Sequence, residues 1–171
     1  MDGFVFVDKP QGVSSFLLAA KVRRIFKEKK SGHTGTLDPM ATGVMVVALS
    51  GATRFIELLA DKDKAYKAAF LLGTETDTFD ITGSVISKMQ VTAKKADVQK
   101  ALELFRGETE QLPPMYSALK KDGVRLYELA RKGESIEREK RKVTISSLEL
   151  LSYDEESFCG ELYAACSAGT Y

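Results

Sequence analysis

The chain has 171 residues, enough for one domain with a hydrophobic core, and its formal net charge is +1. Apolar residues make up 44% of it and charged residues 29%, which excludes a disordered or fibrous chain. Because the net charge is close to zero, any binding of nucleic acid must come from local patches of lysine and arginine.

No apolar run is long enough to span a membrane, and residues Met1 to Phe4 lack the basic region of a signal peptide. The two cysteines, Cys159 and Cys166, are separated by six residues of mainly apolar sequence. A disulfide framework needs more cysteines, and this spacing with a single histidine makes a poor zinc site. We therefore expect two buried free thiols in a cytoplasmic protein.

The N-terminal part predicts a strand, a turn and a helix. Residues 4–7 are a short apolar strand, and residues 8–12 have the chemistry of a turn. Ser14 and Ser15 are alternative N-caps of the helix that follows. Its expected apolar face is Phe16, Ala19, Ala20 and Phe26. Its other face is basic, which fits either a solvated surface or a phosphate contact: Lys21, Arg23, Arg24, Lys27, Lys29 and Lys30.

The middle of the chain predicts two strands separated by loops. Residues 31–43 form a loop with three glycines in thirteen positions. The continuous apolar run 44–49 predicts a buried strand, and residues 55–59 predict one or two helical turns. Residues 66–72 predict another strand, after which an acidic, threonine-rich loop runs over 73–83.

The last part mixes helices and strands without regular alternation. Thr92 is expected to cap a helix that ends at Gly107, and a short helix is expected near 124–131. Segments 143–151 and 158–165 predict a hairpin. The helix that Thr92 is expected to cap has four expected apolar positions: Val98, Ala101, Leu102 and Phe105. This irregular order favours an α+β fold over a doubly wound sheet.

The loop 31–43 holds the residues best suited to chemistry. It contains the only histidine, His33, and it contains Asp38 directly before Pro39, a position that disfavours helical geometry. A carboxylate on a rigid loop before a buried strand is well placed for a covalent or acid–base role. The residues alone nevertheless favour an ordinary Asp-Pro turn.

Other kinds of site have weaker support. No Ser-His-Asp triad is evident, because the single histidine lies close to Asp38 in the same loop. No glycine-rich phosphate loop with its Lys-Ser/Thr occurs either. Glu75, Asp77 and Asp80 could bind a hard metal ion, but their spacing matches no known loop.

Five segments resemble, in the same order, the motifs of the TruB family of pseudouridine synthases. The one that carries most weight is Gly32-His-Thr-Gly-Thr-Leu-Asp-Pro-Met-Ala-Thr-Gly43, which resembles the catalytic motif of that family. The others are residues 7–15, 64–83, 111–120 and 166–171. Together the five segments span essentially the whole chain, so a chance similarity is excluded.

The resemblance implies an α+β pseudouridine synthase fold, with a mixed, mainly antiparallel sheet flanked by helices and loops. It implies conversion of uridine to pseudouridine at position 55 in the T loop of tRNA. The glycosidic bond is broken, the base rotates, and the bond re-forms through C5. The family uses no cofactor and no metal. The expected partner is the tRNA T stem-loop, bound by a cytoplasmic monomer.

The resemblance also assigns roles to single residues. Asp38 matches the aspartate that attacks the nucleoside covalently after the base has been flipped out of the RNA. His33 matches the residue that fills the space left by that base. Tyr66 matches the tyrosine that packs on the flipped base and assists proton transfer. Tyr171 matches a second aromatic residue near the pocket. Thr36, within the catalytic motif, is expected to bind RNA.

Basic residues could bind the phosphates of the RNA. Lys29 and Lys30 are the first candidates, and Lys9 either contacts the RNA or anchors its own loop. Thr76, Asp77 and Thr78 are expected to stabilise their own turn. Further phosphate candidates are Lys120, Lys121, Arg125, Arg131 and Lys132.

The sequence departs from the family pattern at its end. In the family, Gly-Thr-Tyr is followed by Ile-Arg, and that arginine pairs with the catalytic aspartate. Here the sequence stops at Tyr171. We therefore expect residues 1–171 to be an incomplete catalytic domain, truncated at the C-terminus, without the small C-terminal RNA-binding (PUA-like) domain and with little or no activity. The alternatives are a non-catalytic RNA-binding or RNA-folding module and a metal-dependent hydrolase.

Overall fold

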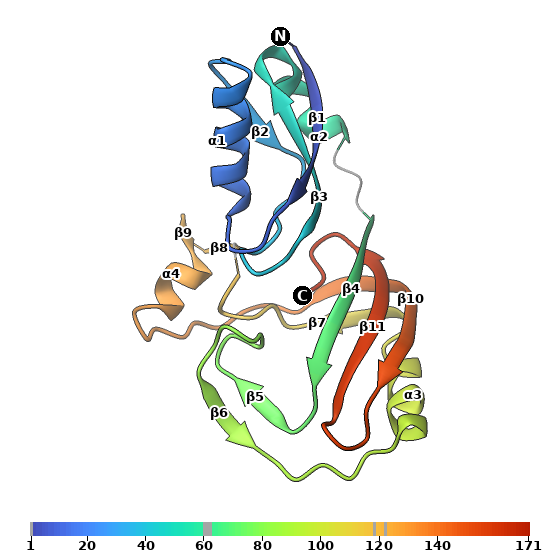
Figure 1. The fold of residues 1–171 in the computed structure, drawn as a ribbon. Coiled ribbons are helices and arrows are strands. Elements are labelled where there is room, and N and C mark those ends of the chain that lie inside the picture. Colours follow the sequence, from blue (N-terminus) through green and yellow to red (C-terminus); the bar gives the residue numbers. More distant parts are fainter. Residues whose placement is uncertain (1, 60–62, 118, 122) are drawn as a thin grey trace. The chain divides into compact units, whose positions relative to one another are not determined.

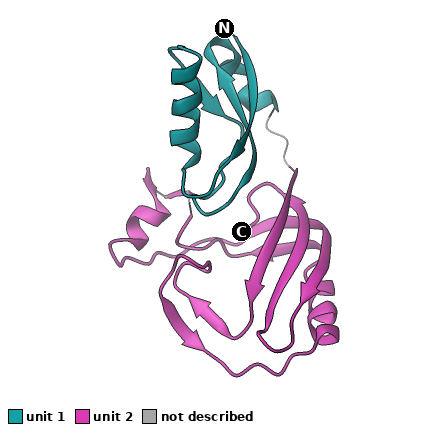
Figure 2. Ribbon diagram, viewed as in Figure 1, with its two compact units in different colours: residues 1–61 teal, residues 62–171 magenta. Residues whose placement is uncertain are grey.

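The computed structural model describes residues 2–59, 63–117, 119–121 and 123–171 (Figure 1). The chain forms two compact units, Met1–Asp61 and Lys62–Tyr171 (Figure 2). Each unit contains its own antiparallel sheet together with short helices. The α+β class predicted from the sequence is therefore confirmed.

Unit 1 is a three-stranded sheet with one long helix beside it. The strand order is β1-β3-β2, and both neighbouring pairs are antiparallel. The strands are β1 (Gly3–Lys9), β2 (Ser31–His33) and β3 (Gly43–Leu49). The helices are α1 (Ser15–Ile25), the 3-10 helix η1 (Ser50–Phe55) and α2 (Ile56–Leu59).

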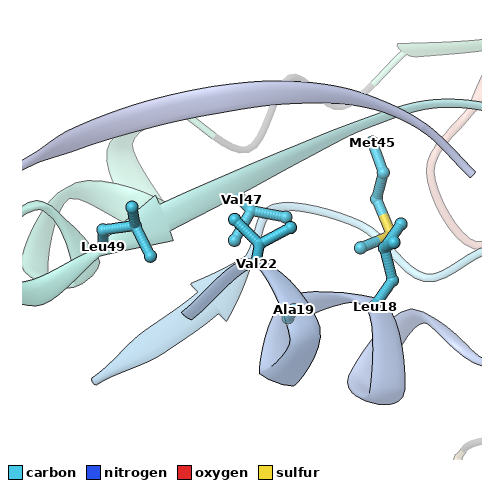
Figure 3. Packing of buried hydrophobic residues seen from close by; sticks show 6 residues of the cluster. All are labelled: Leu18, Ala19, Val22, Met45, Val47 and Leu49. Carbon is cyan, nitrogen blue, oxygen red and sulfur yellow. The ribbon is translucent and has the colours of Figure 1, made fainter. Parts of the chain in front are cut away.

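The core of unit 1 lies between α1 and one face of the sheet (Figure 3). Alternate residues of β3 point to the same face, so the predicted buried strand places three apolar side chains opposite the helix. Val47 and Leu49 are completely buried. The six residues of this cluster are Leu18, Ala19, Val22, Met45, Val47 and Leu49.

The expected apolar face of α1 is wrong in part. Ser14 caps the helix, because its side chain accepts a hydrogen bond from the Leu17 N–H at 3.2 Å. The helix therefore buries Leu18 and Val22, which are four residues apart, while Phe16 is 74% exposed. The helix also ends at Ile25, so the last lysines of the basic stretch lie beyond it.

Unit 2 contains a four-stranded antiparallel sheet in the order β4-β11-β10-β7. The strands are β4 (Asp63–Leu71), β7 (Gly107–Gln111), β10 (Arg141–Tyr153) and β11 (Cys159–Ser167). The β10–β11 pair confirms the predicted hairpin. The remaining elements are β5 (Thr74–Thr76), β6 (Val85–Lys88), α3 (Lys95–Glu103), β8 (Lys120–Lys121), β9 (Val124–Arg125) and α4 (Leu126–Ala130).

Several local predictions in unit 2 need correction. Helix α3 begins at Lys95 and not after Thr92, because the Asp97 carboxylate accepts a hydrogen bond from the Lys94 N–H at 2.9 Å. Of its expected apolar positions Val98 is buried, whereas Phe105 is 55% exposed. Among the cysteines, Cys166 is a buried free thiol as predicted, but Cys159 is exposed and also free.

Gly160 on β11 lies between two aromatic residues of the neighbouring strands, Phe70 of β4 and Tyr153 of β10. The ring of Phe70 stacks on Tyr153 with centroids 6.2 Å apart. A Cβ atom at Gly160 would lie 2.4 Å from Phe70 Cζ and 2.8 Å from the Ser152 carbonyl oxygen. Because the second of these atoms belongs to the backbone, the contact cannot be relieved by a side-chain rotation alone.

We therefore expect Gly160→Ala to lower the free energy of unfolding by about 1–3 kcal/mol through overpacking. The measurement is equilibrium denaturation in urea, followed by circular dichroism. Cys159→Ala is the matched control, because the neighbouring side chain is exposed and its truncation should change stability little. Equal stability of the two variants would contradict the packing role of Gly160.

Candidate active-site loop

The loop from Thr34 to Thr42 joins β2 to β3 and carries Asp38. Its first residue is tied to the sheet, because the Thr34 N–H donates to the Val46 carbonyl at 3.1 Å. A turn follows Asp38, whose own carbonyl accepts from the Ala41 N–H at 3.0 Å. The Gly12 N–H donates to the Pro39 carbonyl at 2.7 Å, which links this loop to the turn after β1.

Lys9 is completely buried and holds the same two segments together. Its Nζ donates to the carbonyls of Pro10 at 3.1 Å, Val13 at 2.7 Å and Pro39 at 3.3 Å. Three N–H donors therefore meet three acceptors, which offsets the cost of removing this polar group from water. Of the two roles that the sequence left open for Lys9, the structure supports the anchor, since a contact with RNA would require these bonds to break.

Ser15 contacts the loop on the other side of Asp38. Its Oγ donates to the Leu37 carbonyl and accepts from the Leu37 N–H, both at 2.9 Å. From the sequence, Ser15 was expected only as an alternative helix cap at the end of the segment 7–15, and it was not placed in the site. One feature of the sequence could have indicated this role. Two serines are adjacent where a single helix cap, Ser14, is sufficient, so the second is free for another contact.

Asp38 itself is exposed, and so is Thr36. Within the described residues, no hydrogen bond or ion pair occupies the Asp38 carboxylate. Its backbone is fixed at both neighbours, Leu37 and Pro39, while its side chain remains accessible. Such an arrangement can present a carboxylate to an external ligand in a fixed position.

His33 is the last residue of β2, where it pairs with Val47. Its side chain is partly buried, and its buried Nδ1 has no hydrogen-bond partner among the described residues. Lys29 and Lys30 are exposed in the connection between α1 and β2. The Lys30 carbonyl accepts from the Ser50 N–H at 2.9 Å, which holds this connection against the start of η1.

The two predicted tyrosines belong to unit 2. Tyr66 lies in the middle of β4, paired with Ala164 of β11, and it is 39% exposed. Tyr171 follows β11, and its N–H donates to the Gln111 Oε1 at 2.7 Å. The Gln111 Nε2 also donates to the Tyr171 carbonyl, so one side-chain amide holds both backbone groups of this residue.

The basic segment of unit 2 is built around Tyr127. The guanidinium groups of Arg125 and Arg131 lie 5.8 and 5.2 Å from the centre of its ring. The Arg125 Nη1 also donates to the Tyr127 hydroxyl at 3.0 Å. Lys120 and Lys132 are exposed nearby in the sequence, whereas the side chain of Lys121 lies outside the described residues.

The prediction that Thr76, Asp77 and Thr78 stabilise their own turn is confirmed. The Thr76 hydroxyl donates to the Asp80 carbonyl and the Asp77 Oδ1 accepts from the Ser84 N–H, both at 2.8 Å. The Asp80 Oδ1 accepts from the Thr78 hydroxyl, the Thr82 hydroxyl and the Thr82 N–H. Burial of Asp80 opposes its ionisation, but these hydrogen bonds outweigh it and hold the pKa of the carboxyl below its usual range. Across the described residues, no cluster of three or more His, Cys, Asp or Glu side chains could hold a metal ion.

The sequence profile of the TruB family of pseudouridylate synthases, N-terminal domain, matches residues 23–171. This chain belongs to that family. The match includes the Asp38 loop, β3 and the whole of unit 2.

Relatives in this TruB family are similar over the whole chain. The chain is 47% identical to a protein named tRNA pseudouridine synthase B from Pseudomonas paraeruginosa, of which it covers 56%. It is 50% identical to one of the same name from Chromohalobacter salexigens, of which it covers 55%. The chain thus spans little more than half the length of these relatives.

Solved structures with the same fold come from larger assemblies. A chain of a Cbf5-Nop10-Gar1 complex matches with a TM-score of 0.71 and 27% identity, over 99% of this chain and 40% of that one. An H/ACA RNP bound to a substrate RNA containing 2'-deoxyuridine matches with a TM-score of 0.66 and 22% identity, over 99% and 39% of the two chains. These matches confirm the predicted pseudouridine synthase fold. Within the described residues, no helix is long and apolar enough to cross a membrane.

The buried position of Lys9 predicts a large effect on stability. We expect Lys9→Met to lower the free energy of unfolding by about 3 kcal/mol, because three carbonyls lose a donor in a site closed to water. The measurement is urea denaturation at equal protein concentration. Lys21→Met, on the exposed side of α1, is the control and should change stability by less than about 0.5 kcal/mol. A Lys9→Met variant as stable as this control would contradict the anchoring role.

Proposed function

We propose that the protein to which this chain belongs converts uridine to pseudouridine at position 55 in the T loop of tRNA, with Asp38 as the nucleophile. The observation that carries the proposal is the accessible Asp38 carboxylate, held on a fixed backbone inside the family's catalytic motif. The names and identities of the relatives support the choice of tRNA as substrate.

The reaction is an isomerisation and needs no oxidant, reductant or cofactor. The N1–C1′ bond of the nucleotide breaks, and a C5–C1′ bond forms. The proton on C5 is lost to solvent, and N1 gains one. Asp38 supplies a carboxylate that forms a covalent bond to the nucleoside and is released at the end, so the electron count of the enzyme is unchanged.

The target base must leave its stack in the RNA before Asp38 can reach it, at a cost of about a few kcal/mol. We assign His33 to the space that the base leaves, and Thr36 to contacts with the RNA close to Asp38. Tyr66 stacks on the flipped base and its hydroxyl assists proton transfer, while Tyr171 adds a second aromatic face. Lys9 acts only through the loop that it anchors.

The expected partner is the T stem-loop of tRNA. One solved structure with the same fold is of an RNP bound to a substrate RNA, which supports an RNA ligand for this fold. The exposed Lys29 and Lys30, together with the basic segment around Tyr127, supply positive charge for phosphates. We infer that the protein acts as a cytoplasmic monomer that uses no metal.

The decisive variant is Asp38→Asn, which keeps the size of the side chain but removes the nucleophile. We expect turnover to fall at least about 1,000-fold, while the Kd for tRNA changes less than about threefold. Turnover is measured as release of tritium from tRNA labelled at C5 of uridine. Glu57→Gln, an exposed carboxylate on α2, is the control.

The assay is run with residues 1–171 alone and with these residues joined to the remaining part of a relative. We expect the joined protein to be active and the chain 1–171 to bind tRNA. Substantial turnover by Asp38→Asn in the joined protein would disprove the proposed role of Asp38. Binding without turnover in every form would favour the non-catalytic RNA-binding alternative.

Lys29 and Lys30 predict a change in the salt dependence of RNA binding. Replacing both with Ala should weaken binding more at low salt than at high salt, because fewer counterions are released. The slope of log K against log[salt] should become shallower by about one for each lost phosphate contact. Lys94→Ala with Lys95→Ala, two exposed lysines at the start of α3, is the matched control. An unchanged slope would remove Lys29 and Lys30 from the interface.

A further inference from the structure

One buried hydroxyl controls both peptide groups of the residue before Asp38. Ser15 is 3% exposed, and its Oγ accepts from the Leu37 N–H and donates to the Leu37 carbonyl, both at 2.9 Å. The first of these groups belongs to the peptide between Thr36 and Leu37. The second belongs to the peptide that carries the Asp38 nitrogen. The two bonds therefore fix the planes on both sides of Leu37.

The chemistry of this contact requires a hydroxyl. A single oxygen that both donates and accepts is supplied by Ser or Thr, and not by Ala or by an ionised carboxylate. A small side chain is also needed, because the site is closed to solvent. The bond to Leu37 is not the helix cap, since Ser14 performs that function through the Leu17 N–H.

Ser15 is held firmly by its own element. It lies in the first turn of α1, whose Leu18 and Val22 belong to the buried core against β3. Through Ser15, the position of Leu37 is therefore fixed relative to the packed core of unit 1. On the other side of Asp38, the Pro39 carbonyl is held by the Gly12 N–H and the Lys9 Nζ. The exposed Asp38 is thus enclosed between two fixed neighbours.

We propose that Ser15 is a positioning residue for the Asp38 carboxylate: its hydroxyl sets the backbone from which the nucleophile reaches the nucleoside. This inference rests on the proposed function of Asp38. Loss of the hydroxyl releases the peptide before Asp38, while Lys9 and Gly12 still hold the carbonyl of Pro39, which belongs to the peptide between Pro39 and Met40. The carboxylate then samples orientations that do not lead to attack, although the RNA-binding surface is unchanged.

The kinetic test uses Ser15→Ala and Ser14→Ala in the joined protein described above. For Ser15→Ala we expect kcat to fall roughly 100-fold with KM within about twofold, as for a misplaced reactive group. Ser14→Ala loses the helix cap and lowers the thermal midpoint, but kcat should stay within about twofold, because its hydroxyl does not touch the loop. The pair separates positioning from a general loss of stability.

Ser15→Thr provides the conservative variant, because it restores the hydroxyl, and its kcat should recover most of the loss. Amide hydrogen exchange at Leu37 in residues 1–171 gives a readout that does not depend on catalysis. Exchange should become at least about tenfold faster in Ser15→Ala than in the unsubstituted chain and in Ser14→Ala. In Ser15→Thr it should remain slow.

The outcomes distinguish this inference from the proposed function. If Asp38→Asn abolishes turnover but Ser15→Ala keeps a normal kcat, the positioning role is overturned and the nucleophile stands. An equal loss of kcat in Ser14→Ala and Ser15→Ala would also overturn it, because stability alone would then explain both. If Asp38→Asn retains turnover, the proposed function fails, while the exchange result at Leu37 still reports whether Ser15 holds the loop.

Discussion

The hydrogen bonds between residues 9–15 and the loop after β2 are the constraint on which the candidate site depends. Lys9, Gly12 and Ser15 each form a hydrogen bond with a backbone group of the segment that carries Asp38. A loop outside regular structure must satisfy its backbone groups by other means when it is not fully solvated. Here the partners are supplied by the first strand, the first turn and the first helix, so the loop is as fixed as those elements are.

The elements that supply these partners are themselves held by the small core of unit 1. Val47 and Leu49 of β3 are fully buried against α1, and β1 pairs with β3 along its whole length. Gly32 of β2 allows the Ile56 side chain of α2 to approach the sheet closely, because a Cβ atom at Gly32 would lie 2.5 Å from that side chain. The site therefore combines an accessible side chain with a backbone that is tied to packed structure on each side.

What the sequence predicted well is what local patterns determine. The continuous apolar run of β3 and the two β-like segments of the β10–β11 hairpin are signals contained in the local sequence, and both predictions were confirmed. The buried face of α1 was predicted less well, since it depends on where the cap lies and on which strand packs opposite. The burial of Lys9 could not be predicted, because its acceptors include a carbonyl 30 residues away. The same holds for Ser15, whose partner Leu37 is 22 residues away.

Two aspartates of this chain show how geometry separates a structural carboxylate from one that we propose to react. Asp80 accepts hydrogen bonds from Thr78 and Thr82, which stabilise its ionised form and commit it to its own turn. The backbone on both sides of Asp38 is equally well fixed, yet no described residue forms a hydrogen bond or ion pair with the Asp38 carboxylate. In Asp80 the side chain stabilises the loop, whereas in the Asp38 loop other residues provide the stability. A nucleophile needs the second arrangement, because a lone pair already used within the protein is not available to a substrate.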